Sequence, residues 1–257
     1  MRYPIRKLLL AATLATGSFA FTTASHSNKT VAATDNNASI SVERSTVLPA
    51  PAPMPVASAE AATKELYSEL HLAENGLHEE VFDLALKGFN KLEGSGKIPN
   101  EDKITIVDFS QPSNQKRLYV IDLNRKHILF QSFVSHGRGS GELWAKSFSN
   151  QPSSYKSSPG FYVTEETYTG HNGYSLRLDG LEKGINDNAR NRDIVMHGAP
   201  YVSESAIGAL GFLGRSQGCP AIPLALHKPI INTIKDGTCL FIYTPDESYL
   251  NHSELLE

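Results

Sequence analysis

The chain has 257 residues and a formal net charge of −3, and hydrophobic residues make up 40% of it. This hydrophobic content supports a folded core, and a charged fraction of 20% excludes wholesale disorder. A weakly acidic chain lacks the basic footprint of a nucleic-acid binder, so we expect no nucleic-acid partner.

Residues 1–24 have the pattern of an export signal. Arg2, Arg6 and Lys7 precede an apolar stretch that runs to Phe21, and small residues near its end suit a signal peptidase. A single membrane anchor is the alternative, but the stretch is short for a span and polar residues interrupt it. We therefore expect an exported protein of the periplasm or cell envelope, without stable membrane insertion after cleavage.

Two segments precede the main domain. Residues 25–60 are rich in Ala, Ser, Thr, Asn and Pro, a composition that cannot bury a core and predicts a disordered tether. Residues 61–96 carry apolar side chains at helical spacing on both sides of a stop near Gly76, which predicts a helical N-terminal segment.

From Ile104 the pattern changes to short β-rich runs separated by turn residues. We predict a mainly β domain with short helices over residues 100–246, followed by a C-terminal tail at 247–257. One short helix is expected at 224–234. The predicted strands are 104–109, 117–123, 127–134, 160–164, 174–178, 194–196 and 238–243.

The two cysteines lie in different sequence contexts. Cys239 belongs to an apolar β run and is interpreted as a buried core thiol. Cys219 lies between Gly218 and Pro220 in a turn-like segment. A disulfide between the two cysteines is the alternative in an exported protein, and it would block any chemistry at Cys219.

Cys219 has neighbours that suit a nucleophile. A reactive thiol needs a lowered pKa, some exposure and donors for an oxyanion, and its base is usually His. We expect the N–H groups of Gly218 and Cys219 to face one site, and Arg215 to supply positive charge. His197 ends an apolar run beside Gly198, which places it at the rim of a site. From the residues alone, a core thiol and a surface His remain the alternative.

The other histidines give weaker hypotheses. His136 lies in a Gly-rich loop, where it either lines the cleft or is simply exposed. His171, His227 and His252 are expected to be surface or packing residues. Because no His or Cys has a ligand-like spacing to acidic residues, we expect neither a metal nor a cofactor.

The His-Gly pair at 197–198 and the Ser-x-Gly-Cys motif at 216–219 resemble the murein L,D-transpeptidase catalytic domain family, which has the YkuD fold. The likeness covers about residues 104–245 and leaves the N-terminal helices outside. It implies a YkuD-like β-sandwich or barrel domain preceded by a helical segment.

The resemblance also implies a role for each site residue. Cys219 matches the acyl-forming nucleophile and His197 the general base. Ser216 and Gly218 match the loop that shapes the oxyanion site, and Gly198 belongs to the His-Gly motif beside them.

The implied reaction is cell-wall cross-linking without a cofactor. The thiolate attacks at diaminopimelate of a peptidoglycan tetrapeptide stem, D-Ala leaves, and an amine of another stem resolves the thioester. Resolution by water is the alternative and gives an L,D-carboxypeptidase. A non-catalytic envelope or host-interaction protein is the second alternative. The family also implies acylation by carbapenem-type β-lactams.

The chain departs from the commoner family pattern at two positions. Gln217 stands where many members have His, and Ala221 stands where many have an Arg that meets a substrate carboxylate. We hypothesise that Arg215 takes over part of that role, because it is the nearest cation in sequence.

Overall fold

The computed structural model describes residues 56–257. The predicted export signal and most of the predicted tether therefore lie outside the described residues. None of the helices in the described range is long and apolar enough to cross a membrane. The elements are α1 (Val56–Glu69), α2 (Glu79–Gly94), β1 (Lys103–Asp108), β2 (Leu118–Asp122), β3 (His127–Ser132), β4 (Gly160–Gly170), β5 (Gly173–Gly180), the 3-10 helix η1 (Arg190–Arg192), β6 (Val195–Ala199), α3 (Glu204–Leu210), β7 (Ala221–Pro223), α4 (His227–Ile234), β8 (Cys239–Tyr243) and α5 (Glu247–Leu250).

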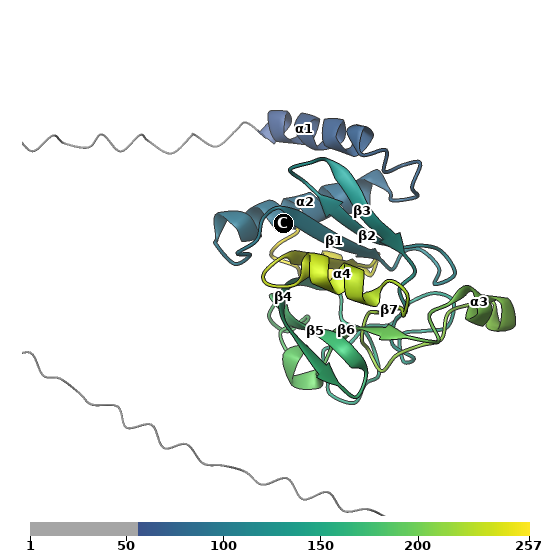
Figure 1. Ribbon diagram of the computed structural model, residues 1–257. Coiled ribbons are helices and arrows are strands. Elements are labelled where there is room, and N and C mark those ends of the chain that lie inside the picture. The colour runs from purple at the N-terminus through teal and green to yellow at the C-terminus, as the bar shows by residue number, and fades with distance from the viewer. Residues whose placement is uncertain (1–55) are drawn as a thin grey trace, which may run out of the picture. The chain divides into compact units, whose positions relative to one another are not determined.

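The strands form one eight-stranded sheet in the order β3-β2-β1-β8-β4-β5-β6-β7 (Figure 1). Strands β1 and β8 pair in parallel, as do β6 and β7, and the other neighbours are antiparallel. Ser135, which follows β3, forms an antiparallel bridge with Ala221 of β7. The two edges of the sheet thus approach each other in a near-barrel, and the predicted mainly β fold is confirmed.

Strand β8 separates two hydrophobic cores. Its residues alternate between the two faces, as the period of two in a strand requires. Cys239, Phe241 and Tyr243 join the core that α2 covers, whereas Leu240 and Ile242 join the core that α4 covers. All five side chains are buried. Cys239 is therefore a core thiol as predicted, and both cysteines are free.

Helix α2 packs closely against the sheet at Gly88. A Cβ atom at this position would lie 2.1 Å from the ring of Phe161. That ring stacks on Phe241 of β8 with 4.2 Å between the ring centroids. Because both rings are buried, they have no free space into which to move. Only glycine at position 88 allows the helix to approach the rings this closely.

The helical segment starts earlier than predicted, and the predicted C-terminal tail packs against the domain. Helix α1 begins at Val56, inside the predicted tether of 25–60, because the segment after Pro55 is rich in Ala, the best helix former. The predicted tail at 247–257 contains α5 and the buried side chains of Tyr249 and Leu256. A segment this short has too few residues for its periodicity to reveal the packing.

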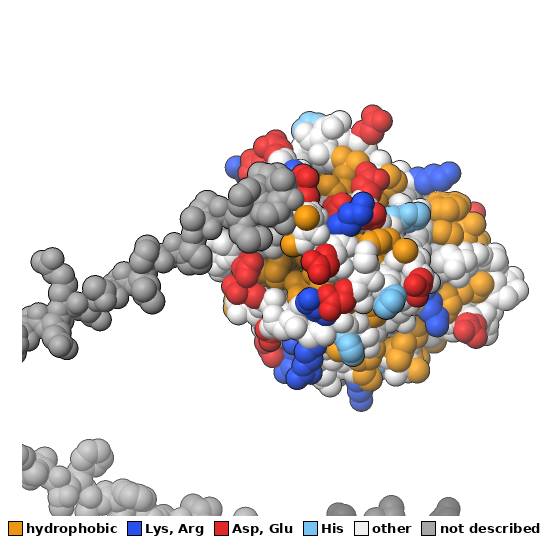
Figure 2. All heavy atoms as spheres, turned by 90° about the horizontal axis from the view of Figure 1, so that it is seen from above, with side chains coloured by type: hydrophobic (Ala, Val, Ile, Leu, Met, Phe, Trp, Pro, Cys, Tyr) orange, Lys and Arg blue, Asp and Glu red, His pale blue; other side chains and the backbone are white. Residues whose placement is uncertain are grey.

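Exposed charged side chains do not organise the fold. Acidic and basic side chains are interspersed on the face that Figure 2 shows. Ion pairs between exposed side chains, such as Lys126 with Glu69, contribute little to stability in water. The two apolar cores therefore carry most of the folding free energy.

We expect Gly88→Ala to destabilise the protein. Alanine gains about 1 kcal/mol over glycine in a helix, but overpacking a closed core costs about 1–3 kcal/mol, and a contact of 2.1 Å with Phe161 lies at the severe end. Urea denaturation should show a net loss of about 1–2 kcal/mol. Gly94→Ala in the same helix is the control, because a Cβ atom there meets nothing within 4 Å. Equal stability of the two variants would contradict this account of the packing.

Candidate active site

The pairing of β6 with β7 assembles the site. In this parallel ladder His197 is the partner of Ala221, and Gly198 is the partner of Ile222. Cys219 lies two residues before Ala221. The structure therefore brings His197 and the segment that carries Cys219 onto adjacent strands, although 21 residues separate them in the sequence.

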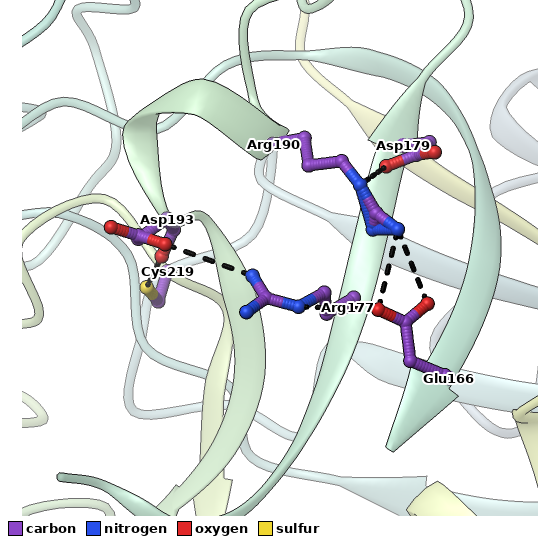
Figure 3. Close-up of polar contacts among 6 residues, drawn as sticks. All are labelled: Glu166, Arg177, Asp179, Arg190, Asp193 and Cys219. Atoms are coloured by element: carbon purple, nitrogen blue, oxygen red, sulfur yellow. Dashed lines mark hydrogen bonds and ion pairs between the residues drawn. The ribbon is translucent and has the colours of Figure 1, made fainter. Parts of the chain in front are cut away.

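The thiol of Cys219 is almost buried and is held by the turn that leads into β6. The residue is 8% exposed. The Sγ atom donates a hydrogen bond to the backbone carbonyl of Asp193 at 3.5 Å (Figure 3). Asp193 has a positive φ of 54°, which turns the chain from η1 into β6. The resting thiol thus has a defined position next to the strand of His197.

Hydrogen bonds fix the loop that carries Cys219. The hydroxyl of Ser216 accepts from the N–H of Gly218 at 3.0 Å and donates to the carbonyl of Cys219 at 2.7 Å. Gly218 has a φ of 129°, and a Cβ atom there would lie 2.8 Å from the carbonyl oxygen of Lys156. Glycine is required for both reasons. The N–H of Gly218, predicted to face the substrate, is held by Ser216 in this conformation.

The orientation of His197 leaves one ring nitrogen free to take a proton. The ring is buried, and Nδ1 donates a hydrogen bond to the carbonyl of Gly198 at 3.1 Å. Since a carbonyl only accepts, Nδ1 carries the hydrogen and Nε2 is the acceptor. A Cβ atom on Gly198 would lie 2.7 Å from the ring of His227, so this glycine makes room for the partly buried His227.

Electrostatics favour a neutral pair at rest. Burial raises the pKa of the Cys219 thiol, an effect that the N–H of Val195 and the charge of Arg192 oppose. Burial also lowers the pKa of His197, and the nearby His227 acts in the same direction. The thiol therefore keeps its proton and the imidazole stays free to accept one.

His136 occupies neither of the two positions expected for it. Its side chain is fully buried. Arg117 donates a hydrogen bond to its Nδ1 at 2.8 Å, and Phe109 packs edge-on against its ring. Its carbonyl accepts from the N–H of Ser216 at 3.0 Å. The buried pair of Arg117 and His136 therefore lies directly behind the Cys219 loop and supports it.

Arg215 points toward a neighbouring loop. Its Nη1 donates to the carbonyl of Gly141 at 3.1 Å and lies 3.8 Å from the carboxylate of Glu142. Its suggested role in holding a substrate carboxylate remains a prediction. Across residues 56–257 no three His, Cys, Asp or Glu side chains are grouped so that they could hold a metal ion.

Some site residues were missed by the sequence analysis. Asp193 contributes a backbone carbonyl, which no side-chain pattern reveals. Arg192 and Arg117 resemble ordinary surface cations in the sequence. In the structure Arg117 is fully buried, which lowers its pKa to about 9, and Arg192 is half-buried.

The family model described as the L,D-transpeptidase catalytic domain (YkuD_2) matches residues 73–243. The chain belongs to this family. The match supports the prediction that the protein is an enzyme of the L,D-transpeptidase class. It also corrects the extent of the likeness, because it includes α2, which was expected to lie outside. The close packing of the backbone at Gly88 against the ring of Phe161 joins this helix to the sheet of the domain.

Solved L,D-transpeptidases resemble the chain only distantly. One from Mycobacterium smegmatis is 11% identical, covers 56% of this chain and 59% of its own, and has a TM-score of 0.35. One from Mycobacterium tuberculosis H37Rv is 16% identical, with coverage of 56% and 58% and a TM-score of 0.36. L,D-transpeptidase 3 from Mycobacterium tuberculosis, in complex with a faropenem-derived adduct, is 14% identical, with coverage of 56% and 60% and a TM-score of 0.35. The chain thus spans less than two thirds of these proteins, and no curated protein sequence matches it.

We expect His136 to make the protein acid-sensitive. Burial and the charge of Arg117 lower the pKa of His136 from 6.5 to about 3. The folded state therefore binds fewer protons than the unfolded state in this range, and stability falls as the pH drops below 6.5. Between pH 6.5 and about pH 5 the loss from this one group is about 2 kcal/mol.

Urea denaturation of His136→Gln at the two pH values measures this contribution. The variant should be less stable than wild type at neutral pH but lose about 2 kcal/mol less on acidification. The same exchange at exposed His171 controls for the loss of a histidine as such. An unchanged acid dependence in His136→Gln would show that His136 is not the sensitive group.

Proposed function

We propose that the protein is a cysteine-dependent peptidoglycan L,D-transpeptidase. The observation that carries the proposal is the parallel pairing of β6 with β7 in a domain of this family. This pairing places a histidine with a free Nε2 beside the loop of a buried cysteine. The donor substrate is the tetrapeptide stem of peptidoglycan, cleaved after diaminopimelate.

The reaction starts with a proton transfer from the Cys219 thiol to Nε2 of His197. The thiolate attacks the carbonyl carbon between diaminopimelate and the terminal D-Ala, and a thioester forms as the C–N bond breaks. His197 returns its proton to the departing amine of D-Ala. The side-chain amine of a second stem then attacks the thioester, which forms an amide cross-link and restores the thiol.

The loop around Cys219 prepares the site for the tetrahedral intermediate. Ser216 holds the N–H of Gly218 and the carbonyl of Cys219, and thereby sets the direction of the Cys219 N–H. Preorganised backbone donors of this kind stabilise a developing oxyanion. The carbonyl of Gly198 keeps His197 in its tautomer. Arg215, four residues before Cys219, is proposed to turn from Gly141 and Glu142 to the carboxylates of the stem.

Release of the thioester to water is the alternative outcome and gives an L,D-carboxypeptidase on the same stems. The two activities share Cys219 and His197 and differ in the nucleophile that reaches the thioester. We further propose that residues 1–24 direct export, so that the domain meets its substrate in the periplasm or cell envelope. Detection of the protein in the cytosolic fraction of its source cells would contradict this location.

We expect purified protein to convert isolated tetrapeptide muropeptides into cross-linked dimers with loss of D-Ala, as measured by mass spectrometry. A carbapenem-type β-lactam should form a covalent adduct on Cys219. Cys219→Ala should abolish products and adduct. Cys239→Ala is the matched control and should keep both, because Cys239 is a core thiol away from the site.

The products separate the alternatives. Tripeptides without dimers would identify the carboxypeptidase. Absence of both turnover and adduct in a folded protein would contradict the proposed enzyme and favour a binding protein that has kept the fold.

We expect the acid limb of the pH–rate profile to lie below pH 6.5. His197 must be neutral to act as a base, and its lowered pKa keeps it neutral at lower pH than an ordinary histidine. The rate of Cys219 acylation by the β-lactam, followed by mass spectrometry between about pH 4 and pH 8, measures this limb. A midpoint at or above 6.5 would exclude the desolvated His197 as the base.

A further inference from the structure

Arg192 is a fixed cation without a carboxylate partner. Its guanidinium donates four hydrogen bonds, and all four acceptors are backbone carbonyl or hydroxyl oxygens: Ser149 O at 2.8 Å, Ser158 Oγ at 2.6 Å, Ser154 Oγ at 3.2 Å and Lys156 O at 2.7 Å. Within residues 56–257 no carboxylate forms an ion pair with it. Neutral acceptors fix the position of the guanidinium and leave its charge uncompensated.

The neighbouring arginines are neutralised. Arg190, in the same turn of η1, lies 3.2 Å from Glu166 and 3.2 Å from Asp179. Arg177 of β5 bridges Glu166 and Asp193 at 3.3 and 3.7 Å. Figure 3 shows this network reaching the turn that holds Cys219. In this part of the domain Arg192 is thus distinguished by its free charge.

Arg192 also lies against the nucleophile loop. Its Nη2 is 3.5 Å from the position that a Cβ atom on Gly218 would occupy. Asp193, the next residue in the chain, provides the carbonyl that holds the Cys219 thiol. These two contacts place the guanidinium near the Cys219 loop, where its charge interacts with the thiol.

We propose that Arg192 is a positioning residue whose uncompensated charge stabilises the thiolate of Cys219. The inference rests on the proposed function, in which Cys219 is the nucleophile. A thiolate in a buried site is costly because water cannot solvate it, and a fixed cation replaces part of that solvation. The protein thus keeps the thiol neutral at rest but makes its ionisation accessible during acylation.

The side chains of Asp193, Tyr201, His197 and Lys156 near the sulfur supply no free positive charge to stabilise the thiolate. The carboxylate of Asp193 opposes ionisation, but it is mostly exposed and paired with Arg177. Burial raises the pKa of Tyr201 to about 12, so its phenol is neutral, and His197 is uncharged until it takes the proton. Lys156 donates its ammonium hydrogen to Ser147. The remaining help comes from the backbone N–H groups of Val195 and Cys219, which favour the thiolate together with Arg192.

The test is the pH dependence of Cys219 alkylation by iodoacetamide in the full chain, with the modified site identified by peptide mass. We expect Arg192→Gln to raise the apparent thiol pKa by about one unit or more, which lowers the rate at neutral pH about tenfold. Arg192→Lys keeps the charge and should stay within about twofold of wild type. Arg190→Gln is the matched control in the same turn and should leave the titration unchanged.

Two results would overturn the proposal. One is a thiol pKa in folded Arg192→Gln equal to that of wild type. The other is an equal rise in Arg192→Lys and Arg192→Gln, which would show that the guanidinium only shapes the 149–158 loop. Circular dichroism of each variant establishes that the fold is retained.

Wild-type protein gives a second readout that needs no variant. An uncompensated cation beside the sulfur should make anionic iodoacetate react faster, relative to neutral iodoacetamide, than it does with the same protein in denaturant. An equal or lower ratio would contradict the proposal even if Arg192→Gln does not fold. Because neither measurement uses a peptidoglycan substrate, failure of the charge effect is distinct from failure of the transpeptidase assay.

Discussion

The hydrogen bonding of β7 to β6 is the contact on which the site depends. Strand β7 has only three residues, yet it pairs with β6 on one side and with Ser135 on the other. This double pairing nearly closes the sheet and holds the Cys219 loop beside His197. A strand of three residues is not stable by itself, so β7 is held in place by its hydrogen bonds to the neighbouring segments of the sheet.

The position that this pairing gives to Cys219 creates an electrostatic conflict. Burial raises the pKa of the thiol, whereas the proposed acyl transfer needs the thiolate. In the proposed reaction, His197 on the adjacent strand is the neutral base and Arg192 next to the loop is the fixed cation. Partial burial of Arg192 among neutral oxygen acceptors lowers the pKa of its guanidinium, which is a cost to the fold that the proposed role at Cys219 explains.

The support behind the loop is built from the same domain core. Arg117 holds the ring of His136, and the carbonyl of His136 accepts a hydrogen bond from the N–H of Ser216. The hydroxyl of Ser157 donates to the carbonyl of Gly218. Helix α2 locks the opposite face of the sheet through Gly88. The chain thus anchors the short Cys219 loop on a rigid scaffold, and the proposed reaction needs such a scaffold to keep the reacting groups within reach of each other.

The sequence by itself determined the strand-rich core, the turns, the two helices before it and the identity of the His-Gly and Ser-x-Gly-Cys motifs. These follow from local periodicity and from residues such as Gly218, whose conformation few other residues adopt. Only the tertiary structure decided that β7 pairs in parallel with β6, that His136 is buried on Arg117, and that the charge near the thiol comes from Arg192 and not from Arg215. Pairing between strands, burial of a cation and the partner of a backbone carbonyl depend on residues distant in sequence. No local pattern of a single chain encodes them.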